Sequence, residues 1–84
     1  MATPNKVHDR VREIIADVFE LKTAELSANP RMGEIEKWDS LGHIQLLIAV
    51  EQEFGIRFLT ERMPLLTSFD VLCEEIENAR TPKH

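Results

Sequence analysis

Apolar residues recur at helical spacing in three stretches of this chain, and residues that break helices separate the stretches. A helix that buries one face carries apolar side chains three or four positions apart. No stretch sustains the alternation of apolar and polar residues that a half-buried strand requires. The pattern predicts an all-α fold, a small four-helix bundle with three main helices and one short helix.

The first stretch predicts a helix over residues 4–20. Thr3 can cap its start, and Pro4 can take the first helical position, where a missing N–H costs nothing. Six apolar side chains share one face of this helix, and charged side chains occupy the opposite face. The apolar face comprises Val7, Val11, Ile14, Ile15, Val18 and Phe19.

The second stretch predicts a helix over residues 39–54 that stops at Gly55, a residue that readily adopts the left-handed conformation. We expect Leu46 to lie off the apolar face and to be partly exposed, and His43 to lie on the surface. The predicted apolar face comprises Leu41, Ile44, Leu47, Ile48, Val50 and Phe54.

Three further segments complete the chain. Residues 21–38 are predicted to form a long loop, because they include a proline and a glycine, and five apolar side chains can pin this loop to the core. Pro64 limits the next helix to residues 60–66, and a last helix over 68–79 follows with Ser68 as its N-cap. The apolar residues of the loop are Leu21, Leu26, Met32, Ile35 and Trp38, and those of the last helix are Phe69, Leu72, Cys73 and Ile76.

Length and charge limit the class of protein. The chain has 84 residues, which suits a single domain over residues 1–84 and, we expect, a monomer. Its formal net charge of −5 disfavours nucleic-acid and anionic-membrane partners, which need a basic face. The longest apolar run, residues 46–50, is far shorter than the roughly 20 residues that span a bilayer, so we expect no stable membrane insertion. Cys73 is the single cysteine; we expect it to be buried, and its solitude favours a cytoplasmic location.

Asp39, Ser40 and His43 are the residue types of a hydrolase triad, but their spacing argues against catalysis. A triad needs the imidazole between hydroxyl and carboxylate, whereas Asp39 at a helix start acts as a cap. Scattered histidines and a lone cysteine likewise predict no metal site. Capping alone accounts for Asp39 and Ser40, yet a helix N-terminus also suits a phosphate, so a phosphodiester on Ser40 would be well placed.

The sequence around Ser40 resembles the acyl carrier proteins and the wider phosphopantetheine-binding carrier family. The resemblance is carried by Asp39-Ser40-Leu41, then Leu46, then the pattern E-x-E-F-G-I at residues 51–56. The predicted helices and the long loop also fall where that family has them, so the resemblance covers nearly the whole chain. It implies that Ser40 is the attachment site of 4′-phosphopantetheine, whose thiol holds cargo as a thioester.

The resemblance also implies partners. A phosphopantetheinyl transferase would recognise Asp39 as well as Ser40, an acyl- or aminoacyl-loading enzyme would add cargo, and downstream transferases or synthases would receive it. In this family the second helix meets partner enzymes, and its acidic residues face basic patches on them. The matching positions here are the apolar Leu41 and Ile44 and the acidic Glu51 and Glu53.

Three departures from the fatty-acid-synthesis carriers favour a specialised lipid, polyketide or envelope pathway. Trp38 stands where many of those carriers have a small residue, and Gly42 and Gln45 stand where they often have Asp and Glu. An aminoacyl or peptidyl carrier, and an acidic helical interaction module without a prosthetic group, remain alternatives. The bulk of the aromatic residues favours a short, polar or aminoacyl cargo left outside the bundle; these are Trp38, Phe54, Phe58 and Phe69.

Overall fold

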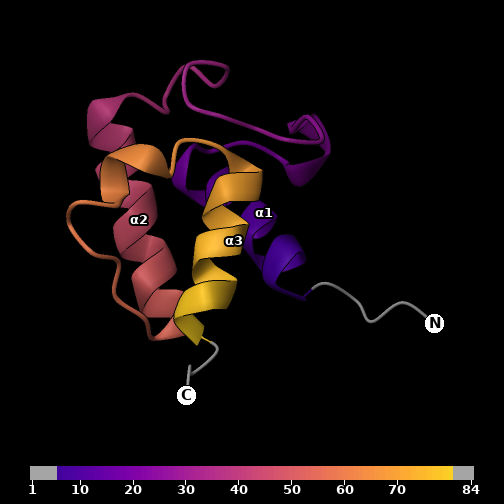
Figure 1. Ribbon diagram of the computed structural model, residues 1–84. Helices are drawn as coiled ribbons and strands as arrows, with labels where there is room; N and C mark the ends of the chain where they lie inside the picture. The colour runs from indigo at the N-terminus through magenta and orange to yellow at the C-terminus, as the bar shows by residue number, and fades with distance from the viewer. Residues whose placement is uncertain (1–5, 81–84) are drawn as a thin grey trace.

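The computed structural model describes residues 6–80, and these form three α-helices and two 3-10 turns. Within this range there is no strand, only two isolated bridges, so the predicted all-α class is confirmed (Figure 1). The predicted cap residues Thr3 and Pro4 lie outside the described residues. The elements are α1 (Lys6–Val18), η1 (Thr23–Glu25), α2 (Ser40–Phe54), η2 (Met63–Leu65) and α3 (Phe69–Arg80).

α1 packs against both α2 and α3 and so lies at the centre of the helical arrangement. Figure 1 shows the segment before α2 crossing the end of the bundle at which α2 begins. The chain then returns alongside α2 through residues 55–68, and this path brings η2 next to the first turns of α2. The start of α2 is therefore surrounded by segments from distant parts of the sequence.

α1 ends two residues earlier than the sequence predicts. Glu20 has a positive φ of 59°, and backbone hydrogen bonds from Glu20 N to Asp17 O and from Leu21 N to Ala16 O close the helix end. This is the Schellman arrangement, which glycine usually occupies. Since Glu20 is not a glycine, the sequence carried no signal for a stop at this point.

α2 begins and ends with the caps that the sequence predicts. The Asp39 carboxylate accepts a hydrogen bond from Gly42 N at 2.8 Å, which satisfies one of the free N–H groups of the first turn. At the other end Gly55 adopts the left-handed conformation with φ 66°, and its N–H bonds to Glu51 O. Both ends of α2 are thus fixed by short-range chemistry.

The predicted face of α2 is wrong in part. Leu46, which we expected to be partly exposed, is completely buried. Leu41 and Ile44, which we placed on the buried face, are 66% and 53% exposed, and Ile48 is 49% exposed. The reason is that apolar residues surround most of this helix, so spacing alone does not decide which side meets the core.

The C-terminal half differs from the prediction in one helix and in the detail of one cap. The predicted helix over 60–66 is a single 3-10 turn, closed by hydrogen bonds between residues three apart. Ser68 does precede α3, but its hydroxyl donates to Asp70 Oδ1 at 2.7 Å. The Asp70 backbone N–H is instead met by Asn29 Oδ1 at 3.0 Å, so the long loop helps to cap α3.

Gly42 permits a close approach between α2 and the loop before it. A Cβ at this position would lie 2.1 Å from the carbonyl oxygen of Lys37 and 3.0 Å from Phe19 Cε1. No side chain fits at these distances without a shift of the backbone. The absence of Asp at this position, noted above as a departure from the fatty-acid-synthesis carriers, thus has a steric reason in this chain.

Gly42→Ala is expected to lower the free energy of unfolding by about 1–3 kcal/mol, because the clash with the Lys37 carbonyl outweighs the roughly 1 kcal/mol by which helices favour Ala over Gly. Chemical denaturation would measure the change. Gln45→Ala, at an exposed position of the same helix, is the control and should alter stability by no more than about 0.5 kcal/mol. A Gly42→Ala protein as stable as the parent would contradict this account.

Candidate functional site

Ser40 is the first residue of α2, and its side chain is exposed. Asp39 directly before it is also exposed at the surface and uses its carboxylate to cap the helix. The hydroxyl therefore lies at the positive end of the helix macrodipole, where N–H groups can meet an anion. The geometry leaves this oxygen accessible to another protein.

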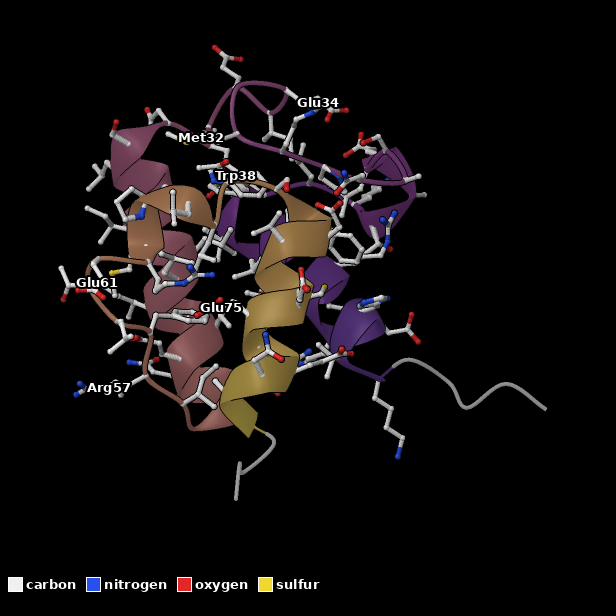
Figure 2. All side chains as sticks on the ribbon, viewed as in Figure 1. Met32, Glu34, Trp38, Arg57, Glu61 and Glu75 are labelled. Atoms are coloured by element: carbon white, nitrogen blue, oxygen red, sulfur yellow. The ribbon has the colours of Figure 1, made fainter. Side chains whose placement is uncertain are left out.

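Trp38, two residues before Ser40, is the buried anchor of this site. Its side chain is only 1% exposed, and its ring stacks on Phe19 with centroids 5.6 Å apart. On its other side it stacks on the His43 ring at 6.2 Å, and its Nε1–H donates to His43 Nδ1 at 3.0 Å. Figure 2 shows Trp38 near the end of the molecule where α2 begins.

His43 is buried, so its predicted surface position is wrong. Its Nδ1 accepts from Trp38, and its Nε2 lies 2.9 Å from the Met63 carbonyl oxygen. These two partners require the ring hydrogen on Nε2, which donates to that carbonyl. The contact between Trp38 and His43 was not predicted from the sequence. The available signal was that an indole and an imidazole flank Asp39 and Ser40 in the sequence.

The same contacts exclude a hydrolase triad at this site. Both ring nitrogens of His43 are engaged by groups other than Ser40, and the Asp39 carboxylate bonds to Gly42 N. A triad needs one imidazole nitrogen on the hydroxyl and the other on the carboxylate. Among residues 6–80, neither the His43 imidazole nor the Asp39 carboxylate is therefore positioned to take the proton of the Ser40 hydroxyl.

A groove of about 410 Å³, here called the Ser40 groove, opens beside the hydroxyl. It separates the first half of α2 from residues 60–67, and apolar atoms form most of its surface. None of the four aromatic residues that we expected to fill a cleft lines it. The lining residues are Met32, Ser40, His43, Ile44, Leu47, Thr60, Met63, Pro64 and Thr67.

The two acidic residues predicted to meet partners have partners within the chain. Glu51 Oε2 accepts from the backbone N–H of Phe58 at 2.8 Å. Glu53 forms a two-pronged ion pair with Arg10, with an Nε–Oε2 distance of 2.8 Å, and hydrogen bonding to this guanidinium lowers the pKa of the Glu53 carboxyl. The carboxylates of both residues thus stabilise the fold.

The outward face of α2 is neutral as a result. Leu41, Ile44 and Ile48 are exposed on it, together with the uncharged Gln45 and Gln52. The first turn of the helix contains no acidic residue. Apart from the exposed carboxylate of Asp39, the surface next to Ser40 is therefore uncharged and largely apolar, although the chain as a whole is acidic.

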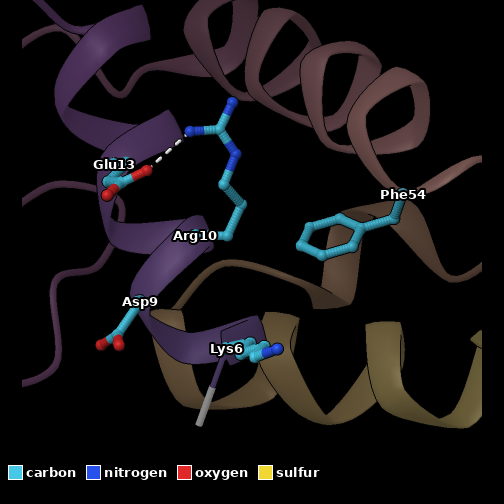
Figure 3. A pocket seen from close by; sticks show the side chains of 5 residues that line it. All are labelled: Lys6, Asp9, Arg10, Glu13 and Phe54. Carbon is cyan, nitrogen blue, oxygen red and sulfur yellow. Dashed lines mark hydrogen bonds and ion pairs between the residues drawn. The ribbon is translucent and has the colours of Figure 1, made fainter. Parts of the chain in front are cut away.

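A second hollow, of about 370 Å³, lies at the opposite end of α2 (Figure 3). It is lined by Phe54 and by four charged residues of α1, and Figure 3 shows the bond between Arg10 and Glu13 of that helix. About 14 residues of helix, or some 20 Å, separate Phe54 from Ser40. This hollow is too distant and too polar to serve an apolar group attached at Ser40.

Comparison with known proteins finds similarity to acyl carrier proteins. No protein-family profile matches the chain. It is 26% identical over 76 residues to a protein of Streptomyces avermitilis named polyketide-8 synthase acyl carrier protein 2, covering 86% of this chain and 87% of that protein. Proteins named acyl carrier protein from Rickettsia typhi and Rickettsia prowazekii are each 34% identical over 56 residues, 67% of this chain and 65% of theirs. The chain is thus similar to proteins named acyl carrier protein.

The kinship with acyl carrier proteins bears out the resemblance and the helical bundle, and it supports an acyl carrier role in general terms. The names of these relatives describe carriers and not catalysts. The chain spans just under two thirds of the length of the Rickettsia proteins. Among residues 6–80 no helix is long and apolar enough to cross a membrane.

Within the same described range, no three His, Cys, Asp or Glu side chains come together as a metal site. Cys73 lies in the hydrophobic core, 1% exposed, as the sequence predicts. Burial, with smaller effects from the carboxylates of Glu77 and Asp70, raises the pKa of its thiol to about 12. The reactive thiolate is therefore scarce near neutral pH.

In the native protein, Cys73 is expected to react with a thiol-specific reagent at least about a hundredfold more slowly than in denaturant, because unfolding restores solvent access and an ordinary pKa. Raising the pH toward 12 should speed the native reaction, since the thiolate forms as pH approaches the raised pKa. Absorbance of the released chromophore gives both rates. Equal rates in native and denatured protein would contradict the buried position.

Proposed function

We propose that Ser40 carries 4′-phosphopantetheine and that the chain passes a thioester-bound acyl group between partner enzymes. The observation that carries the proposal is the exposed Ser40 hydroxyl at the start of α2, beside an apolar groove, in a relative of acyl carrier proteins. The fit is physical as well. A phosphodiester at this position faces the helix N-terminus, and an apolar chain on the arm can reach the Ser40 groove.

For 4′-phosphopantetheine to be attached, the Ser40 hydroxyl only needs to be accessible to the transferase. Its oxygen attacks the β-phosphorus of coenzyme A, a new O–P bond forms, and the bond from phosphorus to the oxygen of adenosine 3′,5′-bisphosphate breaks. That nucleotide leaves with the electron pair, and the hydroxyl proton passes to a base of the transferase. Asp39 holds the helix start in place and lies exposed next to Ser40 for recognition by the same transferase.

The pathway we propose is a specialised one. One relative is named as a polyketide synthase carrier, and the neutral outward face of α2 departs from the acidic helix of fatty-acid-synthesis carriers. The apolar lining of the Ser40 groove favours an acyl cargo over the alternative aminoacyl or peptidyl cargo. An acyl- or aminoacyl-loading enzyme and a downstream synthase or transferase are the partners that this role requires.

Incubation with coenzyme A and a broad-specificity phosphopantetheinyl transferase is expected to add the mass of one phosphopantetheine, and Ser40→Ala should abolish the gain. Ser27→Ala, which removes another exposed serine, is the matched control and should be modified fully. Because Cys73 is buried, the native product should also gain one fast-reacting thiol. An unchanged intact mass, or a gain that survives Ser40→Ala, would reject the proposal.

We further propose that Leu41 and Ile44 form the contact surface for partner enzymes, while Glu51 and Glu53 contribute mainly to stability. The two apolar side chains are exposed beside Ser40, whereas the carboxylates are bonded to Phe58 and Arg10. Recognition through apolar contacts depends little on ionic strength. Partners of this carrier should therefore present an apolar surface to α2.

Ile44→Ala is expected to lower kcat/KM for phosphopantetheine transfer about tenfold, the effect of losing a well-packed interface side chain. Raising the salt concentration should change the rate of the parent protein by less than about twofold. Gln52→Ala, exposed near the other end of α2, is the control and should behave as the parent. A strong loss of rate with salt, and none with Ile44→Ala, would indicate electrostatic docking instead.

The interaction module without a prosthetic group is the second candidate, because the neutral apolar face of α2 would also suit a permanent partner. It makes the opposite prediction for Ser40. If Ser40→Ala leaves partner binding and cellular function intact, the module explains the chain better than a carrier does.

A further inference from the structure

We propose that His43 determines cargo length: by holding the Met63 carbonyl it fixes the distance between η2 and α2, and so limits how long an acyl chain can enter the Ser40 groove. The inference rests on the proposed carrier function and adds to it a residue that selects among acyl groups. It concerns the width of the groove and not the attachment at Ser40.

The Ser40 groove has two walls that come from different parts of the chain. One wall is the first half of α2, and the other is the segment 60–67, which includes η2. The hydrogen bond between His43 Nε2 and Met63 O, 2.9 Å long, joins these walls directly. As long as it is intact, the η2 turn cannot move away from α2.

The position of His43 along α2 makes this bond an obstacle to a growing chain. Ser40 lies at the helix start, His43 about one turn further, and Leu47 about one turn beyond that. All three line the groove. An acyl chain that enters from the arm on Ser40 therefore meets His43 before it reaches Leu47.

The ring itself is held in place from the core side. Trp38 donates to His43 Nδ1 at 3.0 Å, and the indole is buried and stacked on Phe19. The imidazole thus transmits the fixed position of the core to the Met63 carbonyl. Without the hydrogen bond from Trp38, a side chain at position 43 would hold the Met63 carbonyl in a less fixed position.

The other hydrogen bonds and ion pairs of the 60–67 segment do not lead to α2. Arg62 pairs with Glu75 of α3 at 2.9 Å, and the Thr67 carbonyl accepts from Met32 N of the long loop at 2.8 Å. They hold the segment toward α3 and toward the loop. Loss of the His43 bond is therefore expected to widen the groove without releasing the segment from the bundle.

The experiment uses the full chain loaded with straight acyl groups from acetyl to dodecanoyl, transferred from the acyl-coenzyme A by a broad-specificity transferase. Intact mass measures loading. The backbone amide shift of Leu47, at the deep end of the groove, measures how far the chain enters. The chain has a single tryptophan, so one indole N–H resonance reports the bond from Trp38 to His43.

Two substitutions separate the two hydrogen bonds of His43. His43→Asn keeps an acceptor near the Nδ1 position for Trp38 but is too short to reach Met63 O, whereas His43→Gln extends an amide donor toward that carbonyl. In the parent, the Leu47 shift should stop changing at a limiting chain length. His43→Asn should raise that limit by about two carbons or more, and His43→Gln should keep it near the parent value.

Pro64→Gly provides a second route if His43→Asn does not fold. It loosens the η2 turn from the opposite side and should also raise the limiting length. The same limit in the parent and in the folded variants, or no Leu47 shift at any length, would overturn the role of His43 while leaving the carrier function intact. Failure of the parent to load at all would instead overturn the proposed function itself.

Discussion

Burial of the Trp38 indole is the interaction on which the rest of the structure depends. The ring stacks on Phe19 at the end of α1, and its N–H must find an acceptor because an unpaired buried donor costs about 1–3 kcal/mol. His43 supplies that acceptor and is thereby drawn into the core, where its second nitrogen needs the Met63 carbonyl. One aromatic side chain thus fixes the long loop, α2 and η2 relative to one another. Ser40 lies between the two buried rings in sequence, which presents it at the surface of a rigid corner.

Short-range patterns predicted the helices well, and long-range packing decided what they could not predict. The α1 face and both caps of α2 follow from spacing and from the chemistry of Asp39 and Gly55. The buried face of α2 does not, because a helix that is apolar on most sides is oriented by its neighbours, and Leu46 turns inward toward them. The burial of His43 depends on an indole that only the folded loop brings into reach. The sequence predicted Ser40 as an attachment site, but it gave no indication of the groove beside this residue.

Charge is distributed in this chain so that, beyond the Asp39 cap, the first turn of α2 carries no acidic side chain. The net charge is −5, yet Glu53 pairs with Arg10 and Glu51 bonds to the Phe58 N–H, so the acids of the last turns of α2 are used within the fold. Electrostatic docking raises encounter rates and relies on exposed charge beside the reacting group. In the proposed carrier, Asp39 is the one exposed charge directly beside Ser40 among residues 6–80, so docking depends mainly on the shape and apolar area of the partner's surface. Selectivity for partners then comes from contact and not from attraction at a distance.

A hydrogen bond suits the closing of an acyl groove because its net strength is close to the gain from burying a short piece of chain. A neutral hydrogen bond contributes about 0.5–1.5 kcal/mol, and burial of one methylene contributes about 0.8 kcal/mol. One or two methylenes beyond His43 therefore offset the loss of its bond to the Met63 carbonyl, provided that water reaches the two freed groups, as the open mouth of the groove allows. Apolar contacts alone would not produce such a threshold, since an entering chain would replace each lost contact with a similar one. In the role proposed for His43, the polar link across an apolar groove is what makes chain length matter.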